Sequence, residues 1–143
     1  MDNKSDYVTV IHHYKVKPEI VFDAFLDVKK AKKFMFATPT GQMVQAEIDA
    51  RIGGKYTFID RRAGEDILHT GEYQEIKRPH HLVFTFAVPK YSSISTTVEI
   101  DIFDVNDGCE LTLKHSGVLT EYREKTRDGW STILRELAKL VEA

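Results

Sequence analysis

The sequence from residue 44 to residue 115 alternates apolar and polar side chains through six successive segments, which short turns separate. A period of two residues is typical of a β-strand that buries one face. Short connections favour antiparallel pairing, because a parallel crossover needs a dozen residues or more. We therefore expect an antiparallel meander. Its six strands are expected at residues 44–50, 55–62, 67–76, 81–88, 94–102 and 111–115.

The residues between these segments are typical of turns. Gly53-Gly54 separates the first two strands, and Asn106-Asp107-Gly108 before the last strand is the strongest hairpin signal in the chain. Gly71 lies inside a predicted strand, where an isolated glycine indicates a bulge or a bend of the sheet.

One more strand and two short helices are expected before the meander. The strand covers residues 7–15, and Pro18 after it suits the first turn of a helix. A second short helix is expected at residues 28–36, followed by a loop at 38–41. In that helix we expect an inward face of Ala31, Phe34 and Met35 and a solvated face of Lys29, Lys30, Lys32 and Lys33.

Residues 118–143 are expected to form a long helix. Its apolar stripe has the 3.6-residue spacing of an amphipathic helix and consists of Trp130, Ile133, Leu134, Leu137, Leu140 and Val141. The predicted order is therefore β-α-α-β6-α, an α+β fold. In this fold a curved, seven-stranded antiparallel sheet needs a cover for its apolar face, and the long C-terminal helix supplies one.

Length and composition limit the function classes. A chain of 143 residues is expected to form one domain, residues 1–143. The 20 basic and 22 acidic residues nearly balance, which argues against nucleic-acid binding. No apolar run approaches the roughly 20 residues of a membrane span, and the N-terminus lacks the pattern of a signal peptide. We expect a cytoplasmic protein with no membrane partner.

A sheet that curls around one helix often leaves a space between them, and a ligand pocket there would be largely apolar. The alternative is that the same side chains simply fill the core. The large lining candidates are Tyr56, Phe58, Tyr73, Phe84 and Phe86, with Val98 and Trp130 beside them.

Three polar residues share the inward phase of these strands. His115 follows Leu111 and Leu113 at two-residue spacing, while Thr96 and His69 occupy comparable positions. An inward histidine can orient a ligand or move a proton, because its pKa lies near neutrality. The alternative is a histidine whose nitrogens are simply paired with backbone or water.

The sequence contains no G-x-S-x-G, H-E-x-x-H, P-loop or G-x-G-x-x-G motif. His12-His13 and His80-His81 are adjacent on predicted strands, so the two members of each pair point to opposite faces and cannot hold one ion together. We expect no metal and no cofactor. Cys109, the single cysteine, is expected to be an inert thiol, since no basic residue flanks it.

Several blocks resemble one known family. Residues 49–58, DARIGGKYTF, resemble the D-x-R-x-G-G-x-[YF]-x-[FL] signature of the activator of heat-shock-protein-90 ATPase homologue-like family, within the START-like (SRPBCC) helix-grip superfamily. Residues 71–85 are similar to its next block, and Gly129-Trp130 opens a similar final helix. The resemblance implies a seven-stranded sheet that grips the C-terminal helix over a cavity.

Two positions depart from the family pattern. The family often has a tryptophan where this chain has Phe34-Met35-Phe36, and it has Gly-Thr where this chain has Gly108-Cys109. Both positions bear on the shape of the pocket or the last hairpin. The ligand of a typical member therefore does not transfer to this chain.

Three functions are compatible with the sequence. We favour non-enzymatic binding of a small apolar or amphipathic ligand in the cavity. One alternative, implied by the resemblance, is an interaction module that regulates a chaperone ATPase. The other is a cyclase- or dehydratase-like enzyme with His69 and His115 as acid–base groups. The chain is expected to be a monomer or a homodimer. The candidate ligand-binding residues are Tyr56, Phe58, His69, Tyr73, Phe84, Phe86, Thr96, Val98, His115 and Trp130.

Overall fold

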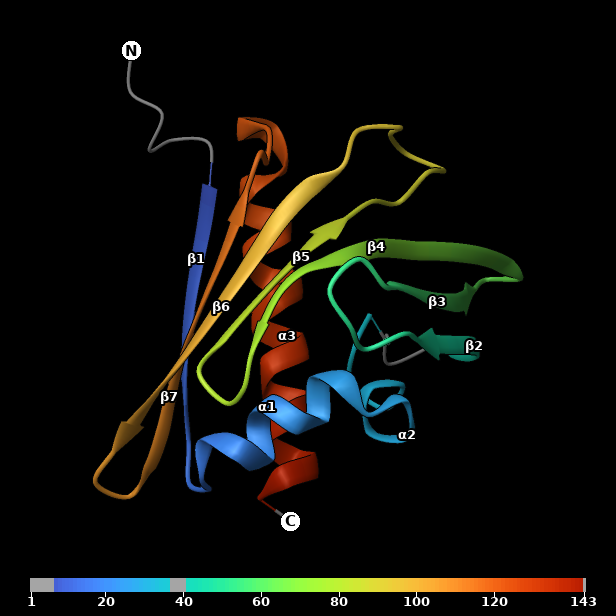
Figure 1. Cartoon of the computed structure of the whole chain (residues 1–143). Helices are drawn as coiled ribbons and strands as arrows, with labels where there is room; N and C mark the ends of the chain where they lie inside the picture. The colour runs from blue at the N-terminus through green and yellow to red at the C-terminus, as the bar shows by residue number, and fades with distance from the viewer. Residues whose placement is uncertain (1–6, 37–40, 143) are drawn as a thin grey trace.

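A computed structural model describes residues 7–36 and 41–142. Seven antiparallel strands form one sheet in the order β1-β7-β6-β5-β4-β3-β2 (Figure 1). The described elements are β1 (Tyr7–Tyr14), α1 (Pro18–Leu26), α2 (Val28–Ala31), β2 (Gln42–Ile48), β3 (Lys55–Arg62), β4 (Glu65–Lys77), β5 (His81–Phe86), β6 (Thr96–Val105), β7 (Gly108–Ser116), the 3-10 helix η2 (Thr120–Tyr122) and α3 (Arg123–Val141).

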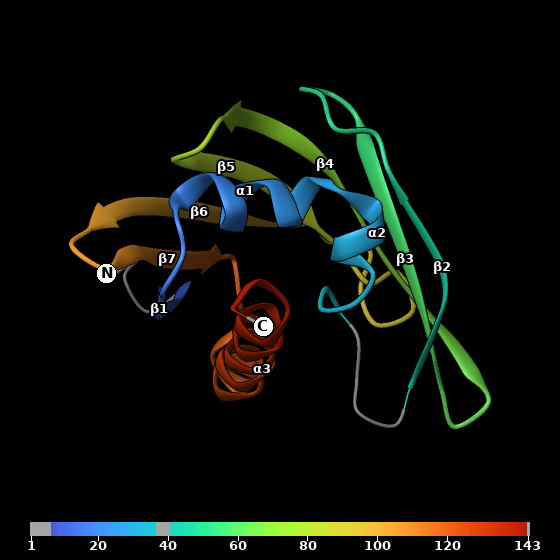
Figure 2. The ribbon, with the colours of Figure 1, turned by 90° about the horizontal axis from the view of Figure 1, so that it is seen from below.

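The sheet curves around α3, which lies on its concave side (Figure 2). The buried side of α3 carries Trp130, Ile133, Leu134 and Leu137, as its spacing predicts. The buried Tyr14 hydroxyl on β1 donates a hydrogen bond to the Leu134 carbonyl at 3.0 Å and so joins the first strand to the last helix. The predicted α+β, helix-grip architecture is confirmed.

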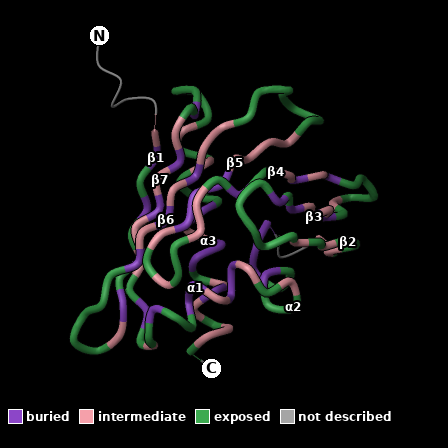
Figure 3. Tube along the Cα trace, viewed as in Figure 1, coloured by how far each residue is buried: buried purple, intermediate pink, exposed green. Residues whose placement is uncertain are grey.

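Buried residues gather along the inner faces of the central strands and on α3, and the hairpin tips are exposed (Figure 3). The turn at Asn106-Asp107 joins β6 to β7 as predicted. Burial raises the pKa of the Cys109 thiol to about 11, so the thiol stays protonated at neutral pH and is a poor nucleophile. Among the described residues, no helix combines the length and the apolarity that a bilayer crossing requires.

Three sequence expectations need correction. A bulge between Met43 and Gln45 shifts the phase of β2, so that Met43 packs against the core and Val44 is exposed. The helix expected at 28–36 ends at Ala31 and continues as turns, although Ala31, Phe34 and Met35 are buried as predicted. β6 begins at Thr96, which leaves Ile94 72% exposed in the preceding connection.

Two further boundaries differ or lie outside the described residues. The last helix begins at Arg123, after the short η2, and not at residue 118. Residues 38–40 of the predicted loop are not among the described residues.

β4 changes its pairing partner next to Gly71, in the region where the isolated glycine predicts a bulge or a bend. The first part of β4 pairs with β3 up to Glu72, and the last part pairs with β5 from Tyr73 onward, with a register shift between Tyr73 and Glu75. A side chain on Gly71 would collide with the Thr85 carbonyl oxygen and the Tyr56 ring. A residue without a Cβ is therefore required where the two parts of the curved sheet meet.

The turn between β2 and β3 uses the Gly53-Gly54 pair. Gly53 has φ +85°, a conformation that favours glycine. Its amide donates to the Tyr73 carbonyl at 2.8 Å, which ties the turn to β4. The Arg51 Nε atom donates to Asp49 Oδ2 at 2.9 Å beside this turn.

Candidate functional site

A cavity of about 390 Å³ lies between the concave face of the sheet and α3. The sheet side supplies aromatic and basic side chains, and α3 supplies mainly small or apolar ones. The lining residues are Phe36, Arg62, His69, Phe86 and His115, with Thr126, Gly129, Trp130, Thr132 and Ile133 from α3.

The structure brings four of the ten sequence candidates to this cavity: His69, Phe86, His115 and Trp130. Thr96 touches it indirectly, because its hydroxyl contacts His115 Nε2 at 2.6 Å. The other five candidates lie elsewhere in the core.

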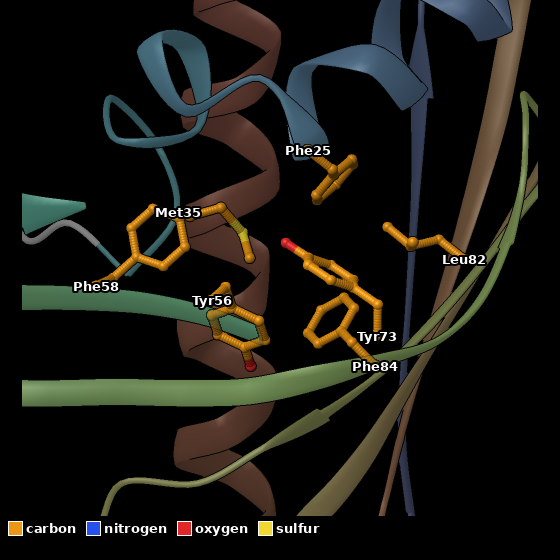
Figure 4. A pocket seen from close by; sticks show the side chains of 7 residues that line it. All are labelled: Phe25, Met35, Tyr56, Phe58, Tyr73, Leu82 and Phe84. Atoms are coloured by element: carbon orange, nitrogen blue, oxygen red, sulfur yellow. The ribbon is translucent and has the colours of Figure 1, made fainter. Parts of the chain in front are cut away.

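Four of those five candidates surround a different and much smaller space. Tyr56, Phe58, Tyr73 and Phe84 line a void of about 10 Å³ together with Phe25, Met35 and Leu82 (Figure 4). That volume corresponds to about one water molecule, so the four rings act as core packing around it. The fifth, Val98, is fully buried in β6. Which of the ten side chains contact a ligand stays a prediction.

Phe36 is the centre of the aromatic wall, and sequence reasoning did not select it. Its ring stacks on His69 with centroids 4.7 Å apart and on Phe86 at 5.2 Å, and it meets Trp130 edge-on at 5.8 Å. Its backbone has φ +59°, a strained conformation for a residue with a bulky side chain. Such strain persists where surrounding contacts determine it, and it is common at functional sites. One feature of the sequence could have indicated Phe36: it lies near the position where the family often has a tryptophan.

Arg62 is the second residue that sequence reasoning missed. It shares the two-residue phase of Tyr56 and Phe58, so its inward direction was readable, but a charge at a strand end suggests solvent exposure. Its Nε atom donates to Asp60 Oδ2 at 2.7 Å, and Nη2 donates to the Phe36 carbonyl at 3.3 Å. Asp60 is fully buried, so the ion pair offsets the cost of burying its charge. Arg62 thereby helps to hold the Phe36 turn and places a guanidinium at the cavity.

His115 is held by hydrogen bonds on both ring nitrogens. The Trp130 indole donates to Nδ1 at 2.9 Å, so Nδ1 carries the lone pair and Nε2 carries the proton. Nε2 then donates to the Thr96 hydroxyl, which in turn donates to the Phe86 carbonyl at 3.2 Å. Burial lowers the pKa of His115 to about 4. This chain of hydrogen bonds links β5, β6 and β7 to α3 through a neutral imidazole.

His69 is also a buried, neutral imidazole. Its Nδ1 contacts the Phe58 carbonyl and its Nε2 contacts Arg62 Nη2, both at 3.4 Å, so Nδ1 carries the proton. Burial first, and then the charge of Arg62, lower the pKa of His69 to about 4. Both ring nitrogens of His69 and of His115 therefore have partners within the protein. This geometry agrees with the alternative from the sequence in which the inward histidines are simply paired.

Gly129 forms the open part of the helical wall. A Cβ built on this residue meets no atom within 4 Å, although the residue lies in the interior of α3. The cavity is therefore an aromatic chamber with one open helical position, one guanidinium and two neutral imidazoles. Such a chamber is suited to an apolar molecule with a polar end.

The curved sheet, the helix on its concave side and the cavity between them define a helix-grip protein of the START-like kind. The family model described as "Activator of Hsp90 ATPase homolog 1-like protein" matches residues 15–142. The chain belongs to this family. A search of curated proteins by sequence found no significant match.

Solved structures agree with this fold. Protein CV1439 of Chromobacterium violaceum is 22% identical with a TM-score of 0.86, and the match covers 96% of this chain and 98% of that one. An AHSA1-like protein of Aeromonas hydrophila is 17% identical with a TM-score of 0.82, over 95% and 92%. An Hsp90 activator of Plasmodium falciparum is 23% identical with a TM-score of 0.73, over 95% and 96%.

Proposed function

We propose that this protein binds a small apolar or amphipathic molecule in the chamber between the sheet and α3. The observation that carries the proposal is the cavity of about 390 Å³ beside Phe36, Phe86 and Trp130. Ligand pockets typically measure about 300–1,000 Å³ and have mainly apolar and aromatic walls with a few polar groups. Burial of apolar surface supplies the affinity, and the polar groups orient the ligand.

The polar end of the ligand is expected to face Arg62. A guanidinium has five N–H donors and no acceptor, so it favours a carboxylate or another oxygen acceptor over an ammonium group. The imidazoles of His69 and His115 are neutral and add no competing charge. An apolar chain or ring with one anionic end is the best match to these walls.

The geometry favours binding over catalysis. Both cavity histidines have a pKa near 4, and each ring nitrogen has a partner within the protein. A general base works best with a pKa near the operating pH. The cyclase- or dehydratase-like alternative thus has no support from these two side chains.

Filling the chamber is expected to abolish ligand binding. Trp130 is the single tryptophan of the chain and lines the cavity, so its fluorescence reports occupancy without a label. We expect octanoate to shift this emission in a saturable way. Gly129→Leu adds a bulky side chain at an exposed position on the rim of the cavity and should weaken octanoate binding at least tenfold, since it obstructs the space in which the probe buries its apolar surface.

Gly129→Ala is the matched control. It adds only a methyl group and should retain binding, while it stabilises α3 by about 0.5–1 kcal/mol relative to glycine. Octylammonium should bind at least tenfold more weakly than octanoate if Arg62 receives the polar end. Equal octanoate affinity in wild type and Gly129→Leu, or a bare mass in native mass spectrometry together with no response to octanoate, would contradict the proposal.

The family supports a second candidate, contact with an Hsp90-class chaperone. The family description refers to activation of Hsp90 ATPase, and one structural neighbour is described as an Hsp90 activator. If this chain has that role, purified protein should raise the ATPase rate of Hsp90 in a coupled assay. Gly129→Leu changes a single position of α3 beside the cavity and should still stimulate the ATPase. Loss of octanoate binding without loss of stimulation would therefore distinguish the two candidate functions. An unchanged ATPase rate with no detectable complex would remove the chaperone role.

A further inference from the structure

The outer face of the sheet, opposite the chamber, carries one histidine among three carboxylates. His81 lies on β5 directly across from Asp101 on β6, and in the next row Val83 lies between Glu75 on β4 and Glu99 on β6. Ile100 and Ile102 alternate with Glu99 and Asp101 and are buried, which places the acidic residues on the outer face. Four ionisable groups thus come together from three neighbouring strands.

The two nitrogens of His81 have different surroundings. Nδ1 lies 2.7 Å from Asp101 Oδ1, which is a strong hydrogen bond. Nε2 lies 3.4 Å from Glu75 Oε1 and 3.8 Å from Glu99 Oε2. With the proton on Nδ1, the Nε2 lone pair points to the side where the two glutamates lie.

We propose that this cluster, the His81 site, binds a divalent transition metal ion such as Zn²⁺. His81 Nε2 and the carboxylates of Glu99 and Glu75 are the ligands. Asp101 is a positioning residue whose carboxylate accepts a hydrogen bond from the Nδ1–H group of His81. Metal-binding histidines commonly donate their second N–H to a carboxylate in this way, which fixes the tautomer and the ring orientation.

The distances suit such an ion. Zinc binds imidazole nitrogen and carboxylate oxygen at about 2.0–2.2 Å, so two ligands of a tetrahedral site are about 3.4 Å apart. Side-chain rotation of partly exposed glutamates closes the remaining gap to Glu99. One ligand atom from each of His81, Glu99 and Asp101 falls within 4.8 Å of the other two, which places two carboxylates beside the imidazole. Glu75 is close to His81 Nε2, and its carboxylate must turn toward Glu99 to complete the proposed ligand set.

The local charge also favours a cation. Three carboxylates surround the imidazole, and Lys77 Nζ lies 3.4 Å from one of them, Glu75. Lys114 is paired with Glu99 in the strand register, but its ammonium lies over the Tyr7 ring at 4.3 Å. A divalent ion would offset the remaining negative charge.

Spacing alone did not predict this site. The expectation of no metal rested on placing His80 and His81 on opposite faces of one strand. In the structure His80 lies in the turn before β5, where its Nδ1 contacts the Ile102 carbonyl at 2.8 Å. Strand pairing supplies the missing ligands, because it places Glu75, Glu99 and Asp101 beside His81 from sequence distances that no motif covers.

The test is titration of the intact protein with ZnCl₂ by isothermal calorimetry at neutral pH in a buffer that does not chelate metal. We expect a saturable site with one ion per chain. His81→Gln and Glu99→Gln should each weaken Zn²⁺ binding more than tenfold. Asp101→Asn should weaken it by roughly tenfold, as loss of an outer carboxylate does.

His13→Gln is the matched control, because His13 is an exposed strand histidine with a single carboxylate partner, Asp107, at 3.0 Å. It should leave the affinity unchanged, and circular dichroism should show all four variants folded. Nitrogen NMR should show the metal on Nε2 of His81, with the proton on Nδ1. Absence of saturable binding, or equal affinity in wild type and His81→Gln, would overturn the proposal; in that case the cluster only pairs the imidazole with the neighbouring carboxylates.

Discussion

Gly71→Ala is expected to destabilise the fold by at least about 3 kcal/mol, at the upper end of the usual range for overpacking. The added methyl group would overlap the Thr85 carbonyl oxygen and press on the Tyr56 ring. The oxygen belongs to the backbone of β5, where Thr85 pairs with Thr97 on β6, and the Tyr56 hydroxyl donates to that same oxygen at 2.7 Å. Both neighbours are thus held in place. The free energy of unfolding from urea titration measures this loss.

Gly129→Ala provides the comparison, because it adds the same methyl group where a Cβ meets no atom within 4 Å. The two variants should change the free energy of unfolding in opposite directions. If Gly71→Ala were as stable as wild type, the close approach of β4 to Thr85 would not exist as described. A stable Gly71→Ala protein would therefore contradict the bend of the sheet.

The stability of the fold is expected to fall steeply as the pH drops from about 6.5 to about 4. His69 and His115 each have a folded pKa near 4, against an ordinary value of 6.5 in the unfolded chain. Above pH 6.5 both states are neutral at these residues and stability does not change. Between the two values only the unfolded chain binds protons, which favours unfolding; below about 4 both states are protonated and the loss is complete. Each residue contributes up to roughly 3 kcal/mol to this loss.

Urea unfolding at several pH values between about 7.5 and 4.5 checks this prediction. His115→Gln and His69→Gln should each flatten the curve of unfolding free energy against pH, even though each variant is less stable at neutral pH. Exposed His13, replaced by Gln, is the control and should keep the wild-type slope. A slope that is the same in all four proteins would show that the buried histidines do not stay neutral in the folded state.

Much of the fold was predictable because local periodicity reports which side of an element is buried. The inward phase of His69 and His115 and the stripe on the last helix follow from spacings of two and 3.6 residues. The β2 bulge at Met43 was not predictable, because one extra residue changes the phase without changing the composition. The prediction that the second helix extends to residue 36 was wrong for a related reason, since the helix ends at Ala31. The turn that ends in Phe36 is held by Arg62, which lies 26 residues further along the chain.

The candidate site was only partly predictable. His69, Phe86, His115 and Trp130 came from their phase within strands or helix, and the structure places all four at the cavity. Tyr56, Phe58, Tyr73 and Phe84 have the same inward phase, yet they surround a water-sized void. The two-residue spacing identifies which face of a strand is buried. It does not identify the position along that face at which α3 lies far enough from the sheet to leave a cavity. Arg62 was missed because a charge at a strand end suggests solvent exposure, and the sequence does not reveal its buried partner Asp60.

The sequence by itself determined the elements, their order, and the absence of any local catalytic or metal-binding motif. Those properties depend on neighbours along the chain, where side-chain period, turn residues and spacing act directly. The tertiary structure alone decided where the empty space lies, which histidine nitrogens carry protons, and which carboxylates surround His81. Those properties depend on residues that strand pairing and the curvature of the sheet near Gly71 bring together. Such contacts join residues far apart in the sequence, so short-range patterns do not predict them.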